Sequence, residues 1–234
     1  LVGSEMCIRD RLVIFNKLVE TEINSDILFQ KIGYCMQMEG DLKGALNAYL
    51  RADLINSESK WVIRRIAGCY RSLKQPEEAL KYYHRYETLN PNNLTVQISI
   101  GHCHLELKNY NEALKCFFKV DYLDNKSHKA WRPIAWCSFL TGKYDQARNY
   151  YKKILENQPN AQDLLNAGHT EWALQNIKGA LAFYKKAVEL EDGDFFKFKE
   201  LFNQDIQDLL IAGIEEKDVA LMLDELRYTL DGEL

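Results

Sequence analysis

The residues that most resemble a chemical site are three neighbours, His102, Cys103 and His104. Imidazole and thiolate groups are common zinc ligands, and a zinc site needs several of them to converge on one point. Residues one or two positions apart on a helix do not share a face, so these side chains would point in different directions. We therefore predict a packed thiol beside two ordinary histidines, and no metal site.

The chain carries no other recognisable catalytic motif. It lacks a glycine-rich phosphate loop, an HExxH helix and a GxSxG nucleophile turn. A Cys–His nucleophile pair would be assembled in space rather than along the sequence, so that alternative stays open, although no residue singles one out. We expect a protein that is not an enzyme and uses no cofactor.

The cysteines are more informative as a pattern. Cys35, Cys69, Cys103 and Cys137 are each 34 residues apart, which indicates an internal repeat rather than a disulfide framework. Three further columns follow this period, with a shift of one residue in the fifth unit. The first column holds small residues: Gly33, Ala67, Gly101, Ala135 and Gly168. The second column is alanine: Ala45, Ala79, Ala113, Ala147 and Ala180. The third column is aromatic: Tyr49, Tyr83, Phe117, Tyr151 and Tyr184.

Each repeat unit is predicted to be a pair of antiparallel helices. Apolar positions within a unit fall three and four residues apart, and turn residues such as Gly40-Asp41 and Gly142-Lys143 interrupt the unit near its middle. Small residues are needed where the two helices approach closely, and the aromatic residue is expected to fill the gap against the next hairpin. The units span residues 26–59, 60–93, 94–127, 128–160 and 161–194.

These columns resemble the tetratricopeptide-repeat (TPR) family, whose 34-residue units carry Gly or Ala at position 8, Ala at 20 and an aromatic residue at 24. The family's frequent proline at position 32 is matched by Pro91 and Pro159, and Ser57, Asn125 and Asp192 depart from it. The resemblance implies an all-α, right-handed α-solenoid of five helical hairpins with an N-terminal half-repeat and a C-terminal capping helix pair. We expect a bacterial member of the family.

The two ends fit the repeat less well. Residues 11–25 match the second helix of a truncated repeat, whereas residues 1–10 match no repeat position and look like non-native or disordered sequence. Residues 195–234 hold four Lys/Arg and ten Asp/Glu, and they predict an acidic cap of two helices, about 195–211 and 215–230. An alternative is that the second of these helices docks onto a partner.

In the TPR family, the first helix of each hairpin lines a concave groove. The resemblance implies a peptide-binding groove with a basic sector and an aromatic sector, formed by Tyr34, Trp61, Arg64, Arg71, His102, Lys129, Arg132, Trp136, Phe139, His169 and Trp172. Tryptophan and arginine dominate binding hot spots. The carboxylate clamp of chaperone-binding members is not expected, because its positions hold Arg64, Gly68, Ser99, Lys129 and Pro133, of which only the two cations match.

We therefore expect a protein–protein interaction scaffold that binds a peptide or helix with acidic and aromatic or aliphatic side chains. Alternatives are a self-associating piece of a longer repeat array, or the regulatory segment of a larger enzyme. The net charge of −4 argues against nucleic acid as a partner, and no run of 18 apolar residues predicts a membrane span. Four packed thiols favour a reducing, cytoplasmic location.

Overall fold

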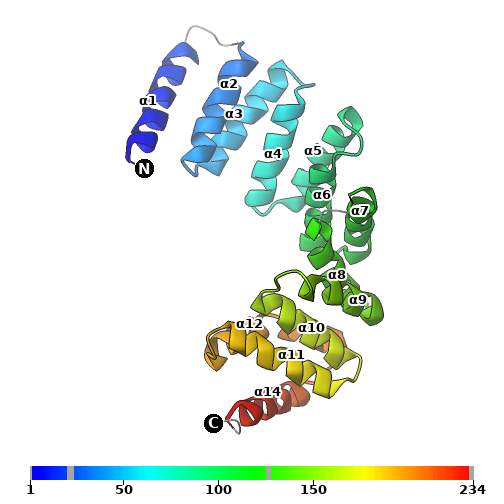
Figure 1. The fold of residues 1–234 in the computed structure, drawn as a ribbon. Coiled ribbons are helices and arrows are strands. Elements are labelled where there is room, and N and C mark those ends of the chain that lie inside the picture. The colour runs from blue at the N-terminus through cyan, green and yellow to red at the C-terminus, as the bar shows by residue number, and fades with distance from the viewer. Residues whose placement is uncertain (1, 20–23, 125–127, 232–234) are drawn as a thin grey trace. The chain divides into compact units, whose positions relative to one another are not determined.

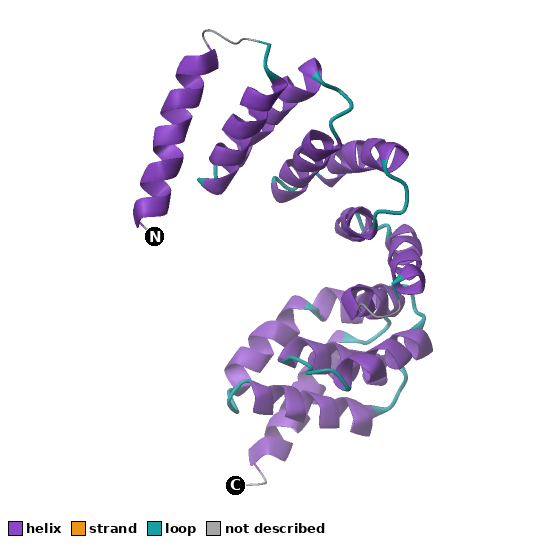
Figure 2. Cartoon of the chain, turned by 45° about the horizontal axis from the view of Figure 1, so that its top comes forward, coloured by secondary structure: helices purple, strands orange, loops and turns teal. Residues whose placement is uncertain are grey.

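The regular structure of this protein is helical (Figure 2). The computed structural model describes residues 2–19, 24–124 and 128–231, and every regular element in these ranges is a helix. The helices gather in two compact units, residues 1–108 and 109–234. Within the described ranges, no helix is long and apolar enough to cross a membrane.

Helices α1 to α6 form the first unit (Figure 1). Their bounds are α1 Val2–Val19, α2 Asp26–Met38, α3 Leu42–Ile55, α4 Lys60–Ser72, α5 Pro76–Leu89 and α6 Leu94–Glu106. Each helix packs against the next one along the chain, and the most extensive contacts join α2 to α3 and α4 to α5. These two pairs are antiparallel hairpins of the predicted kind.

Helices α7 to α14 form the second unit, together with the short 3₁₀ helix η1. Their bounds are α7 Tyr110–Leu123, η1 His128–Ala130, α8 Trp131–Leu140, α9 Tyr144–Leu155, α10 Ala161–Ala173, α11 Ile177–Leu190, α12 Phe195–Gln204, α13 Ile206–Ile211 and α14 Glu216–Asp231. Helices α8 and α9 form one hairpin, and α10 and α11 form another. The predicted all-α fold of sequential hairpins is thus confirmed.

A left-handed residue follows the first helix of each of the five repeats, fourteen residues after the start of that repeat. The φ angles lie between 59° and 84° at Gly40, Lys74, Lys108, Gly142 and Gln175. Glycine adopts this conformation freely, whereas lysine and glutamine are strained in it by about 1 kcal/mol or more. The backbone N–H after the left-handed residue then bonds back to the helix, as from Asp41 to the carbonyl of Met36 at 2.9 Å. The reversal is therefore fixed by backbone geometry even where no glycine marks it.

The repeat columns form the core. All five alanines of the second column are fully buried, and the aromatic residues of the third column are at most 4% exposed. The rings of Tyr49 and Tyr184 cover the glycines of their own hairpins, because a Cβ added at Gly33 would lie 2.6 Å from Cδ1 of Tyr49 and one at Gly168 would lie 2.3 Å from Cε1 of Tyr184. In these two hairpins the aromatic residue packs within its own hairpin, and it also contacts a ring of the following helix, Trp61 for Tyr49 and Phe198 for Tyr184.

The periodic cysteines belong to this core. Cys35, Cys69, Cys103 and Cys137 are free thiols and are buried. Burial raises the pKa of the Cys103 thiol to about 11 and that of the Cys137 thiol to about 12. These thiols are packing residues, as the sequence predicts, and burial makes them poor nucleophiles.

The segments that flank the five repeats are also helical. Helix α1 runs without a break from Val2 to Val19. At the other end, Asp205 interrupts the helix expected over residues 195–211 and separates α12 from α13. The C-terminal segment therefore holds the three helices α12, α13 and α14.

Candidate functional site

An open pocket lies in the first unit between α1, α2 and α4. Its volume is about 450 Å³, and its lining consists of Arg11, Phe15, Ile27, Gln30, Lys31, Tyr34, Cys35 and Trp61. Two predicted groove residues, Tyr34 and Trp61, meet in this pocket. Helix α1 supplies Phe15 and Arg11, which the groove positions of the family did not include.

The α2 wall of the pocket continues as an exposed apolar stripe. Ile27 is 59% exposed, Tyr34 42% and Met38 57%. These residues are seven and four positions apart, so they share one face of the helix. Large apolar side chains gathered on one exposed face are typical of an interaction surface.

A cation is held against two of the three aromatic rings of this pocket. The guanidinium of Arg65 lies 4.9 Å from the ring centroid of Trp61 and 5.6 Å from that of Tyr34. Its Nη1 donates to Oε1 of Gln37 at 3.4 Å, and the same oxygen accepts a hydrogen bond from Tyr49 Oη at 3.0 Å. Its buried Nε has no hydrogen-bond partner among the described residues. Sequence reasoning missed Arg65, although its place one helical turn after Trp61 is a signal for stacking.

The other predicted groove residues of the first unit lie on α4 and α6. Arg64 is exposed, Arg71 is half-buried, and His102 is half-buried. Burial lowers the pKa of His102, the positive charge of Arg71 lowers it further, and Glu106 partly offsets both. His102 is therefore neutral at physiological pH and adds no positive charge to the basic sector.

In the second unit, the basic sector is partly engaged within the protein. Lys129 is exposed on η1. Arg132 forms a bidentate pair with Asp163, with Nε at 2.8 Å from Oδ1 and Nη2 at 2.7 Å from Oδ2. Asp163 is buried, and it also accepts the backbone N–H of Asn160 at the start of α10. The fork of Arg132 is thus already occupied by a carboxylate of its own chain.

The predicted aromatic sector is mostly covered. Trp136 is half-buried and stacks on Phe139 with the ring centroids 5.2 Å apart. Phe139 is 1% exposed, Trp172 is 5% exposed, and His169 is fully buried. Phe139 and Trp172 share one apolar cluster with side chains of α12, α13 and α14, and the ring of His169 packs against Phe202 of α12. The C-terminal segment therefore covers the surface that sequence reasoning had left open.

His169 occupies a polar position inside this cluster. Its Nδ1 lies 2.8 Å from Tyr184 Oη, and its Nε2 faces Oδ2 of Asp205 at 3.5 Å. Burial lowers the pKa of His169, and the neighbouring Asp205 only partly offsets this. The neutral imidazole therefore links α10 to α11 through Tyr184, and it faces Asp205, the residue before α13.

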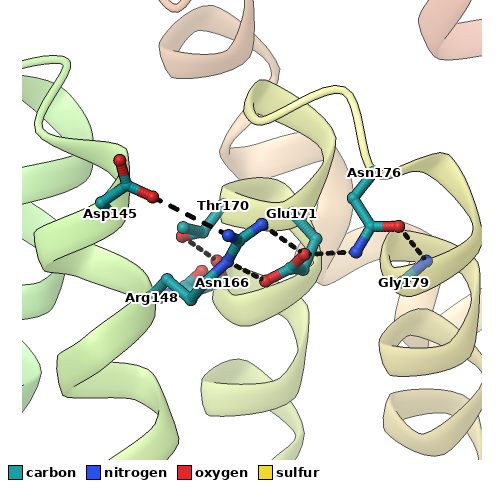
Figure 3. Close-up of polar contacts among 7 residues, drawn as sticks. All are labelled: Asp145, Arg148, Asn166, Thr170, Glu171, Asn176 and Gly179. Carbon is teal, nitrogen blue, oxygen red and sulfur yellow. Dashed lines mark hydrogen bonds and ion pairs between the residues drawn. The ribbon is translucent and has the colours of Figure 1, made fainter.

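A second polar network fixes α9 against α10 and α11 (Figure 3). Arg148 donates two hydrogen bonds to Glu171, at 2.6 Å and 2.8 Å. Asn176 also donates to Glu171 at 2.6 Å, while its own Oδ1 accepts the N–H of Gly179. This buried carboxylate is fully used in joining helices, and we assign it a structural role. No group of three or more potential metal-binding side chains occurs among the described residues.

Comparison with known proteins agrees with the repeat architecture. A family model described as tetratricopeptide repeat matches residues 141–195, and one described as anaphase-promoting complex, cyclosome, subunit 3 matches residues 63–120. A search of the curated proteins gives no significant match.

Solved structures with the same fold include three bacterial proteins. YrrB, described as a TPR protein with an unusual peptide-binding site, is 20% identical with a TM-score of 0.66, covering 76% of this chain and 92% of YrrB. MamA from Desulfovibrio magneticus RS-1 is 16% identical with a TM-score of 0.68, covering 72% and 96%. PilF from Pseudomonas aeruginosa is 20% identical with a TM-score of 0.65, covering 86% and 91%. At these identities the likeness shows the fold.

Proposed function

We propose that this tetratricopeptide-repeat protein binds a peptide or helix of a partner protein in the open pocket of its first unit. The TPR fold is typical of protein–protein interaction and is generally non-catalytic. The observation that carries the proposal is the pocket of Tyr34 and Trp61, which is continuous with the exposed stripe of α2.

The pocket suits an apolar anchor of the ligand. Its volume of about 450 Å³ falls within the range of about 300–1,000 Å³ that is usual for ligand pockets. Phe15, Tyr34 and Trp61 provide aromatic walls, and Trp and Tyr are enriched among residues that dominate binding energy. A leucine, phenylalanine or tryptophan of the ligand would bury its surface against these rings.

The charges beside the pocket favour an acidic residue next to that anchor. Arg65 is stacked on the two rings, and Lys31 lies over Phe15 with its Nζ 5.9 Å from the ring centroid. Neither cation is paired with a carboxylate among the described residues. An arginine held flat by stacking is pre-organised for a bidentate hydrogen bond with a carboxylate. The ligand is therefore a segment with acidic and bulky apolar side chains close together.

The test begins with selection of binding peptides from a random peptide library on the full chain. We expect Tyr34→Ala and Trp61→Ala each to weaken the selected peptides about thirtyfold, which corresponds to about 2 kcal/mol. Leu54→Ala is the matched control, because Leu54 lies on α3 of the same unit and is 87% exposed. Circular dichroism establishes that each variant keeps its helical content.

The contribution of charge is separable from that of the rings. Arg65→Met keeps an apolar stem against the rings and removes the charge, so it should weaken binding and flatten its dependence on salt. Peptides whose affinity responds to neither the aromatic substitutions nor Arg65→Met would place the ligand elsewhere and refute the proposal.

A further inference from the structure

The short helix α13 packs onto the second unit, in the apolar cluster that contains Phe139 and Trp172. Asp205, the residue before α13, accepts a hydrogen bond from Nε2 of Gln162 at 3.1 Å and faces His169. At the other end, Tyr144 Oη donates to the carbonyl of Ala212 at 3.3 Å. The segment thus spans from α10 to the start of α9.

One leucine anchors the helix. Leu209 is fully buried, in the same apolar cluster as Phe139 and Trp172, which the repeat pattern assigns to the groove. Its neighbour Ile211 is 69% exposed. Asp208 lies close enough to Tyr110 to contribute to the raised pKa of that phenol, after the larger effect of burial. The seated segment therefore combines acidic residues with a single deeply buried aliphatic side chain.

The helix has little stability of its own. It is six residues long, it is separated from α12 by the break at Asp205, and it ends just before Gly213, whose φ is +91°. Helices this short do not persist in water without tertiary contacts. Its position is therefore set by the surface on which it lies, and a segment with the same side chains would find the same contacts.

We propose that this surface is a second peptide-binding site, which α13 occupies within the resting chain. The partner is a short helical segment of another protein that carries a carboxylate four residues before a leucine, as Asp205 precedes Leu209. The carboxylate of the partner accepts the hydrogen bond from Gln162 that Asp205 accepts in the resting chain. The leucine of the partner takes the place of Leu209 in the cluster of Phe139 and Trp172. This site is separate from the first-unit pocket, and the inference does not rest on that pocket.

Covalent attachment makes α13 a strong competitor. A segment tethered by a short linker has an effective concentration on the order of millimolar. An external peptide of equal intrinsic affinity must therefore reach about that concentration before it displaces α13. Releasing α13 should strengthen binding of the external peptide by at least about tenfold.

The experiment measures binding of a fluorescein-labelled peptide with the sequence of residues 203–214 to the full chain, by fluorescence anisotropy. Leu209→Glu removes the anchor and should tighten binding at least about tenfold over the unaltered chain. Ile211→Glu is the matched control, since it places the same charge at an exposed position of the same helix and should change nothing. A peptide carrying glutamate at the position of Leu209 should fail to bind either variant.

Three results would overturn the proposal. One is a Leu209→Glu chain that keeps its helical content and binds the peptide no better than the Ile211→Glu chain. Another is that Leu209→Glu loses helical content while Asp205→Asn, which keeps the apolar packing intact, binds the peptide no more tightly than the unaltered chain. Helix α13 would then be an obligatory part of the core. The third is a dimer of the unaltered chain that Leu209→Glu makes monomeric, because the natural occupant would then be a second copy.

Discussion

Two glycines of the first unit offer a matched measurement of how tightly a hairpin is packed. Gly33 lies inside α2 and Gly68 inside α4, and in a helix interior alanine is favoured over glycine by about 1 kcal/mol. A Cβ at Gly68 would meet no atom within 4 Å, whereas a Cβ at Gly33 would lie 2.6 Å from both Cδ1 and Cε1 of Tyr49. Both substitutions to alanine therefore gain helix propensity, but only the one at Gly33 forces a new methyl group against a neighbouring ring.

The ring of Tyr49 has little freedom to withdraw. It is fully buried, its hydroxyl donates to Gln37, and it packs edge-on against Trp61 with the centroids 5.6 Å apart. Overpacking of this kind costs about 1–3 kcal/mol. With the helix-propensity gain subtracted, Gly33→Ala should lower the free energy of unfolding by about 1 kcal/mol, and Gly68→Ala should raise it by about 0.5–1 kcal/mol.

Thermal unfolding followed by circular dichroism measures both changes, each expected to move the midpoint by several degrees in opposite directions. The double variant Gly33→Ala with Tyr49→Leu provides the coupling, since a smaller side chain at position 49 should relieve the added methyl group. Equal stabilisation by Gly33→Ala and Gly68→Ala would refute the packing of Tyr49 on α2.

Three further predictions concern the second unit. Glu171→Ala should lower the free energy of unfolding by about 1–3 kcal/mol, because it removes the buried carboxylate that Arg148 holds through two hydrogen bonds. Asp145→Ala removes an 85% exposed carboxylate from the same arginine and should change this free energy by no more than about 0.5 kcal/mol. Urea denaturation measures both. In the native protein at pH 8, mass spectrometry after pulse labelling should find Cys137, with its raised thiol pKa, among the last thiols modified and the half-buried Cys116 ahead of it. Burial lowers the pKa of His169, so its contribution to stability is complete above the ordinary histidine pKa of about 6.5 and is lost as the pH falls below that value. Unfolding curves measured from pH 7.5 to 5 should therefore show a falling free energy of unfolding. The fall should be smaller in His169→Gln, which has no imidazole to protonate.

The hairpin architecture could be predicted from the sequence because the same residue pattern recurs in every repeat. The contact between Gly33 and Tyr49 lies within one hairpin, so it depends only on residues close together in the sequence. The columns to which these two residues belong therefore predict it. The turns were visible only in part. Gly40 and Gly142 mark theirs, whereas Lys74 and Gln175 adopt the same left-handed conformation without any compositional sign of it.

The candidate sites depended on contacts that do not repeat. Tyr34 and Trp61 meet in a pocket that also needs Phe15 of α1, and Arg65 lies at a position that the family's groove pattern omits. Arg132 was interpreted as free to bind a ligand, but its partner Asp163 comes from the next unit and does not belong to any column. The 34-residue period shows which positions all repeats have in common. It cannot predict a side-chain pair, such as Arg132 with Asp163, that occurs only once.

The two tryptophans Trp61 and Trp172 show why burial must decide the interpretation of a groove residue. Both lie on first helices at positions that the repeat pattern assigns to the groove, and sequence reasoning treated them alike. Trp61 is half-buried beside an open pocket, whereas Trp172 is 5% exposed under the C-terminal segment. Truncating a buried tryptophan costs about 3–5 kcal/mol through lost packing alone. Loss of partner binding in Trp172→Ala would therefore report on folding of the second unit, while the same loss in Trp61→Ala would report on recognition. A variant that leaves Trp172 intact and releases α13, such as Leu209→Glu, is therefore the one that tests whether that surface binds a partner.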